Sequence, residues 1–245
     1  MSYKIRVDRH LEFRGGAGLQ AGVLGHFMEK KRHDSDRFTG IAIDTTNRWA
    51  VSVPGTSDTI AISEVQGGSA LITTGTVDND SCMLASAIIY SGDKNAVVEF
   101  RITITDVSGT GLFVGLSDAK SESNNSVAIH YPGNSLTTVA TDAAGFVIDA
   151  DHESSSIMCA SVDTGVDTTP VDTGVDWADG ETKTLRIIVD TDGAATFVLD
   201  GDVVAKIASS VTPATLLCAT VQAITRADEG ANTVRVRSYD AWQDD

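Results

Sequence analysis

The chain has 245 residues, of which 42% are apolar, and it carries a formal net charge of −16. This length suffices for one large domain with a sizeable core, and no run of about 18 apolar residues is present that would span a membrane as a helix. An acidic body repels phosphate backbones, which argues against nucleic acid as a partner.

Residues 1–37 differ from the rest of the chain in charge and in pattern. They hold eight Lys/Arg against five Asp/Glu, a net of +3, whereas the other 208 residues hold ten against 29, a net of −19. The runs GGAGLQAGVLG and EKKRHDSDR follow neither a helical nor a strand period. We therefore predict an N-terminal arm over 1–37, extended or partly ordered on binding, and one β domain over 38–245. No apolar segment typical of a secretory signal is visible in the arm.

The basic residues of the arm are candidates for docking on an acidic surface, and a solvated tail is the alternative. The candidates are Lys4, Arg6, Arg9, Arg14, Lys30, Lys31, Arg32 and Arg37.

Short alternating runs separated by turn residues begin at Phe38 and continue to the C-terminus. The longest, AVVEFRITITDV, spans residues 96–107. Because successive side chains of a strand point to opposite faces, one face of this strand should be buried and the other open. The expected buried residues are Val98, Phe100, Ile102 and Ile104, and Glu99 lies on the opposite face beside Val97 and Arg101.

The clearest pattern lies between Glu181 and Ile207, ETKTLRIIVDTDGAATFVLDGDVVAKI. Three alternating runs are separated by Asp192-Gly193 and Asp200-Gly201, and Asp-Gly is a strong hairpin signal because both residues tolerate positive φ. This stretch predicts an antiparallel meander. With a dozen or so short strands and a turn every 8–12 residues, the chain as a whole is typical of an all-β antiparallel sandwich or jelly roll.

The three cysteines, Cys82, Cys159 and Cys218, each lie in an apolar strand-like run, so we expect reduced, buried thiols. No nucleophile elbow, P-loop or dinucleotide-binding motif is present. Glycosidases of the jelly-roll type place two carboxylates on one strand as E-x-D-x-x-E, and here Glu99 stands alone in its strand. We therefore expect no catalytic residues and no enzymatic activity.

Two features are candidate binding sites. The hexapeptide VDTGVD occurs at 162–167 and again at 171–176, and its aspartates could supply oxygen ligands to Ca²⁺. The candidate ligands are Asp163, Asp167, Asp172 and Asp176, although Asp is also common in turns without any metal; otherwise no cofactor is expected. Trp177 lies in an Asp/Gly loop and is a candidate glycan contact, the alternative being a residue that caps the end of the sandwich.

Five stretches together resemble a known family. They are residues 58–80, 98–119, 143–151, 185–201 and 219–242, and they look like the concanavalin A-like, laminin-G-like jelly-roll proteins among the virion structural proteins of tailed bacteriophages. The resemblance covers about residues 45–243 and rests on strand order, the Asp78-Asn79-Asp80 turn and the Asp200-Gly201 hairpin.

This resemblance implies a non-enzymatic capsid decoration or cement protein. Its partners would be the major capsid protein and further copies of itself, with a trimer expected, and it would lie on the outer capsid surface after synthesis in the host cytoplasm. The alternatives are a carbohydrate-binding module of a phage tail or fibre and a glycoside hydrolase or lyase with a paired-carboxylate cleft.

Overall fold

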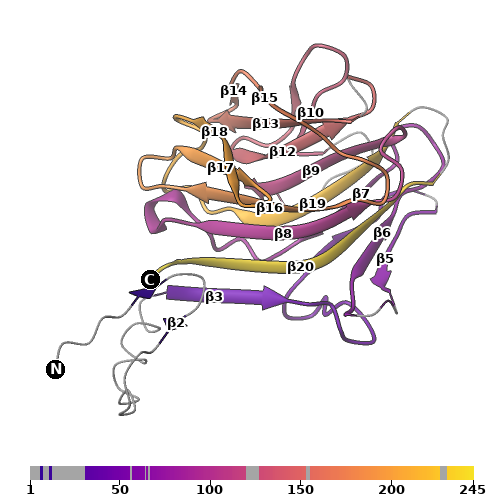
Figure 1. Ribbon diagram of the computed structural model, residues 1–245, viewed down its shortest axis with the longest axis horizontal. Coiled ribbons are helices and arrows are strands. Elements are labelled where there is room, and N and C mark those ends of the chain that lie inside the picture. The colour runs from indigo at the N-terminus through magenta and orange to yellow at the C-terminus, as the bar shows by residue number, and fades with distance from the viewer. Residues whose placement is uncertain are drawn as a thin grey trace.

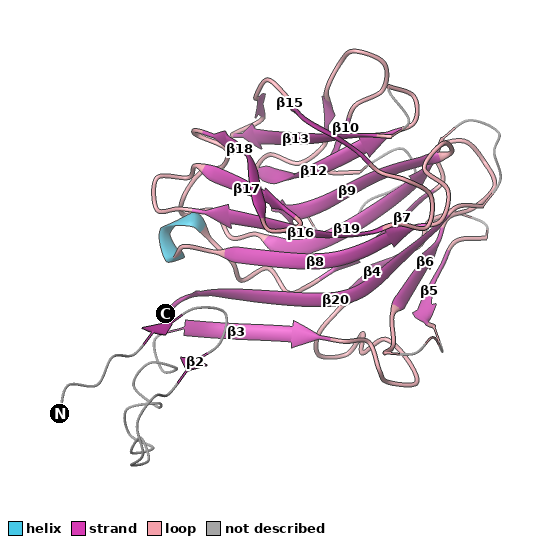
Figure 2. Cartoon of the chain, viewed as in Figure 1, coloured by secondary structure: helices cyan, strands magenta, loops and turns pink. Residues whose placement is uncertain are grey.

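Two antiparallel sheets, each of eight strands, pack face to face in the computed structural model of the protein (Figure 1). The structure describes residues 6–7, 11–12, 31–55, 57–63, 65, 67–119, 127–152, 155–226 and 231–245. Among these residues the sole helical element is the 3-10 turn η1 (Gly92–Lys94) (Figure 2), and no helix long and apolar enough to cross a membrane is found there. The predicted all-β antiparallel sandwich is confirmed.

The first sheet is called the β8 sheet after its central strand. In spatial order it consists of β18 (Asp202–Ile207), β17 (Ala195–Leu199), β16 (Thr182–Val189), β8 (Val97–Ile104), β20 (Thr233–Asp244), β6 (Ala70–Thr73) and β5 (Thr59–Ile62), with β3 (Lys31–Asp36) also paired to β20. β6 pairs with the first part of β20 and β3 with the second, so the two short strands share one edge.

The second sheet is called the β9 sheet. Its strands are β14 (Val166–Asp167), β13 (Ser156–Asp163), β12 (Ala143–Asp149), β9 (Thr110–Ser117), β19 (Cys218–Thr225), β7 (Ser81–Ala85) and β4 (Ala50–Ser52), with β15 (Val171–Asp176) also paired to β13. Two small hairpins lie outside both sheets: β1 (Arg6–Val7) with β2 (Leu11–Glu12), and β10 (Ile129–His130) with β11 (Thr137–Thr138).

The main core lies between the two sheets and follows the predicted alternation. Val98, Phe100, Ile102 and Ile104 of β8 are all fully buried. On the facing strands, the rings of Phe146 and Phe197 meet edge to face with their centroids 5.5 Å apart. All three cysteines are buried, as expected, and none of them forms a disulfide.

The predicted meander is β16, β17 and β18, and both Asp-Gly turns lie where the chain reverses. Gly193 has a φ of +74°, Asp200 of +51° and Gly201 of +101°. These values fall in the region that Gly adopts without steric cost and Asp tolerates. Local turn chemistry therefore determines this part of the sheet.

The structure corrects the predicted boundary of the N-terminal arm. Lys31–Asp36, assigned to the arm, is strand β3, and it pairs in register with Tyr239–Asp244 of β20. Asp36 accepts a hydrogen bond from the indole N–H of the buried Trp49 at 2.9 Å and lies 3.3 Å from Arg48 Nη1. The strand lacks apolar alternation because its inward residues are ion-paired carboxylates. The arm before it falls mostly outside the described residues and stays a prediction.

The central strands of the β9 sheet are buried on both faces, which the sequence pattern does not predict. Every residue of β9, β12 and β19 is buried. A second apolar cluster, including Phe113, Val147 and Met158, packs on the outer face under the segment that contains β10 and β11. This cover leaves the loops at the ends of the β9 sheet, and the outer face of the β8 sheet, as open surfaces.

Candidate functional site

Several loops converge on one buried arginine, Arg226, which directly follows β19. Its side chain is 2% exposed, and its backbone N–H donates to the carbonyl of Gly109, in the turn between β8 and β9, at 2.8 Å. Gly111, at the start of β9, leaves room for the guanidinium, because a Cβ there would lie 3.2 Å from Arg226 Nε and 2.4 Å from Ile224. The end of the β9 sheet is therefore built around this side chain.

Arg226 holds polar groups from three other segments. Its Nη2 donates to Asp149 Oδ2 at 2.8 Å and to His130 Nδ1 at 2.5 Å, and its Nη1 donates to Asn79 Oδ1. Its Nε lies 3.6 Å from Asp151 Oδ2. These five residues are called the Arg226 cluster.

Asp149 is the counter-ion of the cluster and also fixes two neighbouring loops. Its side chain is fully buried. Its Oδ2 accepts the backbone N–H of Tyr131 at 3.0 Å and its Oδ1 accepts that of Asp151 at 3.2 Å. A buried carboxylate needs this pairing and these hydrogen bonds to offset the loss of hydration.

His130 is held as a neutral donor. Because a guanidinium has only donors, His130 Nδ1 must accept from Arg226 and the ring proton lies on Nε2. Burial, and then the charge of Arg226, lower the pKa of His130 and keep it uncharged. Within the described part of the chain, His130 Nε2 and Arg226 Nε are buried without a hydrogen-bond partner. Such unsatisfied buried donors are rare in native proteins.

An aromatic pair and a carboxylate form the rim of the cluster. The rings of Tyr131 and His152, both half-buried, have centroids 4.3 Å apart. The Asp151 side chain is 40% exposed. Burial raises its pKa, the charges of Asp149 and Asp78 add to this, and Arg226 opposes them. The rim thus presents an aromatic surface beside a hydrogen-bond acceptor.

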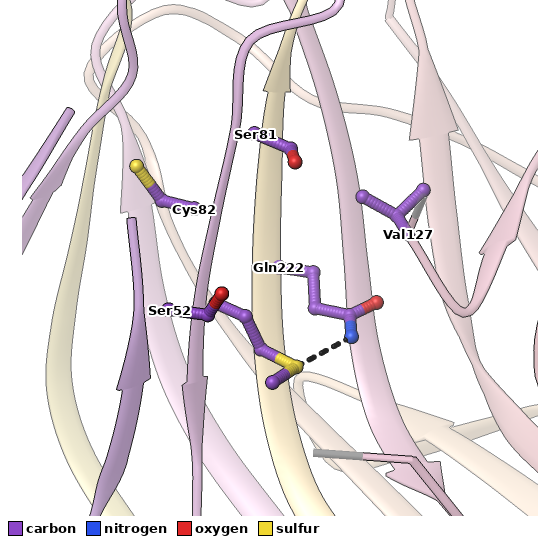
Figure 3. Close-up of a pocket in the computed structure, with 6 residues that line it drawn as sticks. Ser52, Ser81, Cys82, Val127 and Gln222 are labelled. Carbon is purple, nitrogen blue, oxygen red and sulfur yellow. Dashed lines mark hydrogen bonds between the residues drawn. The ribbon is translucent and has the colours of Figure 1, made fainter. Parts of the chain in front are cut away.

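A crevice on the outer face of the β9 sheet is not a ligand site. It lies beside Gln222, whose Nε2 donates to Met83 Sδ at 2.9 Å (Figure 3). The Gln222 Oε1 accepts the N–H of Ala128, in the covering segment, at 2.6 Å. The crevice encloses no space that a water molecule could occupy, so Gln222 secures the cover rather than a ligand.

The structure corrects the prediction that Trp177 is a glycan contact. Trp177 is 2% exposed and belongs to the main core. Its indole N–H donates to the carbonyl of Glu181 at 3.1 Å. It is therefore the capping residue of the alternative interpretation, and neither ring face is open to a sugar.

The predicted calcium ligands do not come together. Asp167 lies opposite Val162, whereas Asp176 lies opposite Ser156, six residues further along β13. At roughly 3.3 Å per residue these positions are about 20 Å apart, too far to share one ion. In the described ranges no group of three or more His, Cys, Asp or Glu is placed to hold a metal. The predicted site of Asp163, Asp167, Asp172 and Asp176 is therefore wrong.

Most of the predicted docking residues lie outside the described side chains: Lys4, Arg6, Arg9, Arg14, Lys30 and Lys31. Arg32 is exposed. Arg37 donates to Asp240 at 2.7 Å and so belongs to the outer surface of the β8 sheet. A capsid-docking role for the arm stays a prediction.

Glu99 has charged neighbours on two adjacent strands, and no local sequence pattern identifies them. It accepts a hydrogen bond from Arg186, which lies directly opposite on β16. It also lies directly opposite Asp240 on β20, 141 residues away in the chain, and Asp240 is paired with Arg37. A search for two carboxylates on one strand cannot detect a pair that spans two strands.

No local sequence pattern predicts the Arg226 cluster. Its members come from separate turns and strand ends, so no local spacing connects them. The available signal was a charged or imidazole side chain at the end of an otherwise apolar run, as in VAIHY, GFVID and ATVQAITR.

No family model matches the chain, and no curated protein matches it. Solved structures do resemble it. The carbohydrate recognition domain of Emp47p has 14% identity over 88% of this chain and 98% of its own, with a TM-score of 0.57. A glycosyl hydrolase family 16 protein from Mycobacterium smegmatis has 13% identity over 85% and 99%, with a TM-score of 0.58. The non-specific endo-β-1,3(4)-glucanase SCLam of family GH16 has 11% identity over 88% and 92%, with a TM-score of 0.60.

These comparisons correct the expectation that the chain is not an enzyme. Two of the three structures belong to glycoside hydrolases, so this fold supports glycoside hydrolysis and the expected absence of activity does not stand. None of the three is a virion protein by name, and the narrower resemblance to bacteriophage proteins stays a prediction. At this level of identity the likeness concerns architecture alone: the chain has the concanavalin A-like jelly-roll fold.

Proposed function

We propose that the protein binds carbohydrate at the rim of the Arg226 cluster. The observation that carries this proposal is the half-buried pair Tyr131 and His152 beside the partly exposed carboxylate of Asp151. Sugars offer apolar C–H faces that pack on aromatic rings and hydroxyl groups that donate to carboxylates. A site with both kinds of group suits a glycan better than it suits a purely apolar or purely ionic ligand.

The buried part of the cluster acts as a support for this rim. Asp149 accepts the N–H groups of both Tyr131 and Asp151, and Arg226 in turn fixes Asp149. A site whose contact residues are held by a rigid hydrogen-bonded layer loses little conformational entropy on binding. The carbohydrate recognition domain among the similar folds is consistent with this class of ligand by analogy only.

Binding is tested with the full chain on an array of neutral and acidic oligosaccharides, followed by calorimetric titration of the best ligand. Asp151→Asn removes the acceptor charge and Tyr131→Ala removes the ring. Each should weaken binding by about tenfold or more, equivalent to roughly 1.4 kcal/mol. Asp192→Asn, a substitution of an exposed aspartate in the meander turn, is the matched control and should leave the affinity unchanged.

Circular dichroism of each variant verifies that the fold is intact. The proposal fails if no glycan on the array binds at millimolar concentration, or if both rim substitutions leave the affinity unchanged. Reducing-sugar release in the same mixtures reports whether bound glycan is also hydrolysed.

A further inference from the structure

Three arginines form a cluster on the outer face of the β8 sheet. Arg235 on β20 lies opposite Thr103 on β8, and Arg101 on β8 lies opposite Ser238 on β20. The register shifts between Val236 and Ser238, and this bulge leaves Arg237 on the same outer side, where its Nε donates to Thr103 Oγ1 at 2.8 Å. The three guanidinium groups therefore share one patch of the sheet.

These arginines lack the acidic partners that the composition would lead one to expect. The chain has 34 Asp/Glu and only 18 Lys/Arg, yet within the described ranges no carboxylate lies within ion-pair distance of Arg101, Arg235 or Arg237. Arg235 donates to the hydroxyl of Ser63 at 2.9 Å. Like charges on neighbouring strands repel each other, so the patch retains an unfavourable arrangement that an external anion would relieve.

The outer face changes in character along β20. Beyond the arginines come Glu99 and Asp240, opposite one another and 23% and 22% exposed. Trp242 follows, half-buried, with the Arg186 guanidinium carbon 5.7 Å from its ring centroid. From Arg235 to Trp242 the strip is roughly 23 Å long at about 3.3 Å per residue. Along its length it offers, in order, hydrogen-bond donors for anions, acceptors for hydroxyl groups, and an aromatic ring.

We propose that this strip binds an anionic polysaccharide, with carboxylate or sulfate groups at Arg101, Arg235 and Arg237. The planar guanidinium fork matches both anions in bidentate geometry. Glu99 and Asp240 accept from sugar hydroxyls, and Trp242 packs against a sugar ring. This surface is separate from the rim of the Arg226 cluster and does not depend on it.

The alternation of charge on the strip favours a polysaccharide over a nucleic acid. A nucleic acid carries a phosphate at every nucleotide, and successive phosphates along the strip would meet Glu99 and Asp240, whose carboxylates already engage the neighbouring Arg186 and Arg37. The net charge of −16 adds a general repulsion to a phosphate backbone. An acidic polysaccharide intersperses its charges with neutral hydroxyls, which matches the observed order.

The test uses the full chain and polygalacturonate as the probe, with sulfated dextran, neutral dextran and duplex DNA in parallel, at low and at physiological salt. We expect the wild type to bind the two anionic glycans, and this binding to weaken with salt. Arg101→Gln/Arg235→Gln should weaken it by about tenfold or more. Lys94→Gln/Lys206→Gln makes the same change in net charge outside the three-arginine patch and should stay within about twofold of the wild type.

Trp242→Ala should weaken binding of the anionic glycans without altering its salt dependence, because the ring carries no charge. The proposal is overturned if neither anionic glycan binds at low salt, if the lysine control loses as much affinity as the arginine variant, or if DNA binds as well as polygalacturonate. Asp151→Asn, which tests the rim of the Arg226 cluster, should leave polygalacturonate binding unchanged. Failure at one surface is thereby distinguished from failure at the other.

Discussion

Replacement of Arg226 by Met tests whether the Arg226 cluster holds the loop end of the β9 sheet together. Met retains much of the volume but removes the charge, and it leaves the fully buried Asp149 without a counter-ion. An uncompensated buried charge of this kind typically destabilises a protein by about 3–5 kcal/mol. For a domain of this size that corresponds to a fall in melting temperature of roughly 6–20 °C.

The double variant Arg226→Met/Asp149→Asn separates the buried charge from the loss of packing. Asn keeps an acceptor for the N–H of Tyr131 and carries no charge, so much of the cost of Arg226→Met should disappear. We expect Asp149→Asn alone to destabilise less than Arg226→Met, because the guanidinium retains Asn79 and Asp151 as neighbours. The coupling energy between the two substitutions should be about 2 kcal/mol, within the range seen for residues in one network.

Urea denaturation at pH 7, followed by intrinsic fluorescence, measures all four members of this cycle. Arg101→Met serves as the control, because Arg101 is exposed and should contribute less than about 0.5 kcal/mol. A cost below about 1 kcal/mol for Arg226→Met, or strictly additive single substitutions, would refute the role assigned to the buried ion pair.

Two further predictions concern pH and backbone conformation. Because the pKa of His130 is lowered by burial and by Arg226, the unfolded chain gains a proton before the folded one as pH falls below about 6.5. Stability should therefore decrease toward acid by up to about 1.4 kcal/mol per pH unit, and His130→Gln should reduce this slope; an identical slope in the variant contradicts the assignment. Gly193→Ala should lower the free energy of unfolding in urea titrations more than Gly201→Ala does. A Cβ at Gly193 would lie 2.2 Å from the Val211 carbonyl oxygen, whereas a Cβ at Gly201 would have no atom within 4 Å. The reverse order of the two variants contradicts this reasoning.

The parts of the fold that were predictable are those determined by short-range pattern. The meander from Thr182 to Ile207 follows from strict alternation and two Asp-Gly turns, and β8 follows from alternation alone. Strand β3 was missed because its inward side chains are carboxylates paired with Arg48 and Trp49. A pattern rule that expects apolar residues inside cannot recognise such a strand.

The repeated hexapeptide demonstrates the limit of local sequence most directly. In the first copy, Thr164 and Gly165 have φ values of +53° and +74° and turn the chain between β13 and β14. In the second copy, the same residues lie within β15, where only Gly174 has a positive φ, of +68°. Identical residues adopt different structures because the pairing partner along β13 differs. The same difference in pairing separates the aspartates of the predicted calcium site.

The candidate surfaces were unpredictable because they depend on tertiary arrangement. The Arg226 cluster joins turns that are up to 147 residues apart in the chain, and the arginine patch requires both the pairing of β8 with β20 and a bulge in β20. Trp177 was selected for its loop composition, yet its loop folds back so that the ring enters the core.

The unequal burial of the two sheets explains why we expect binding at the rim of the Arg226 cluster and on the outer face of the β8 sheet. The central strands of the β9 sheet, β9, β12 and β19, are covered on both faces, so they can use apolar residues and glycine throughout and can support a rigid loop end. The β8 sheet is buried on one face only, which obliges β8, β16 and β20 to alternate and leaves an extended polar face of regularly spaced side chains. A loop end suits a short ligand held at a few points, whereas a strand-long polar face suits a polymer. The two proposed sites therefore differ in ligand length, and a chain-length series of neutral and acidic oligosaccharides should separate them.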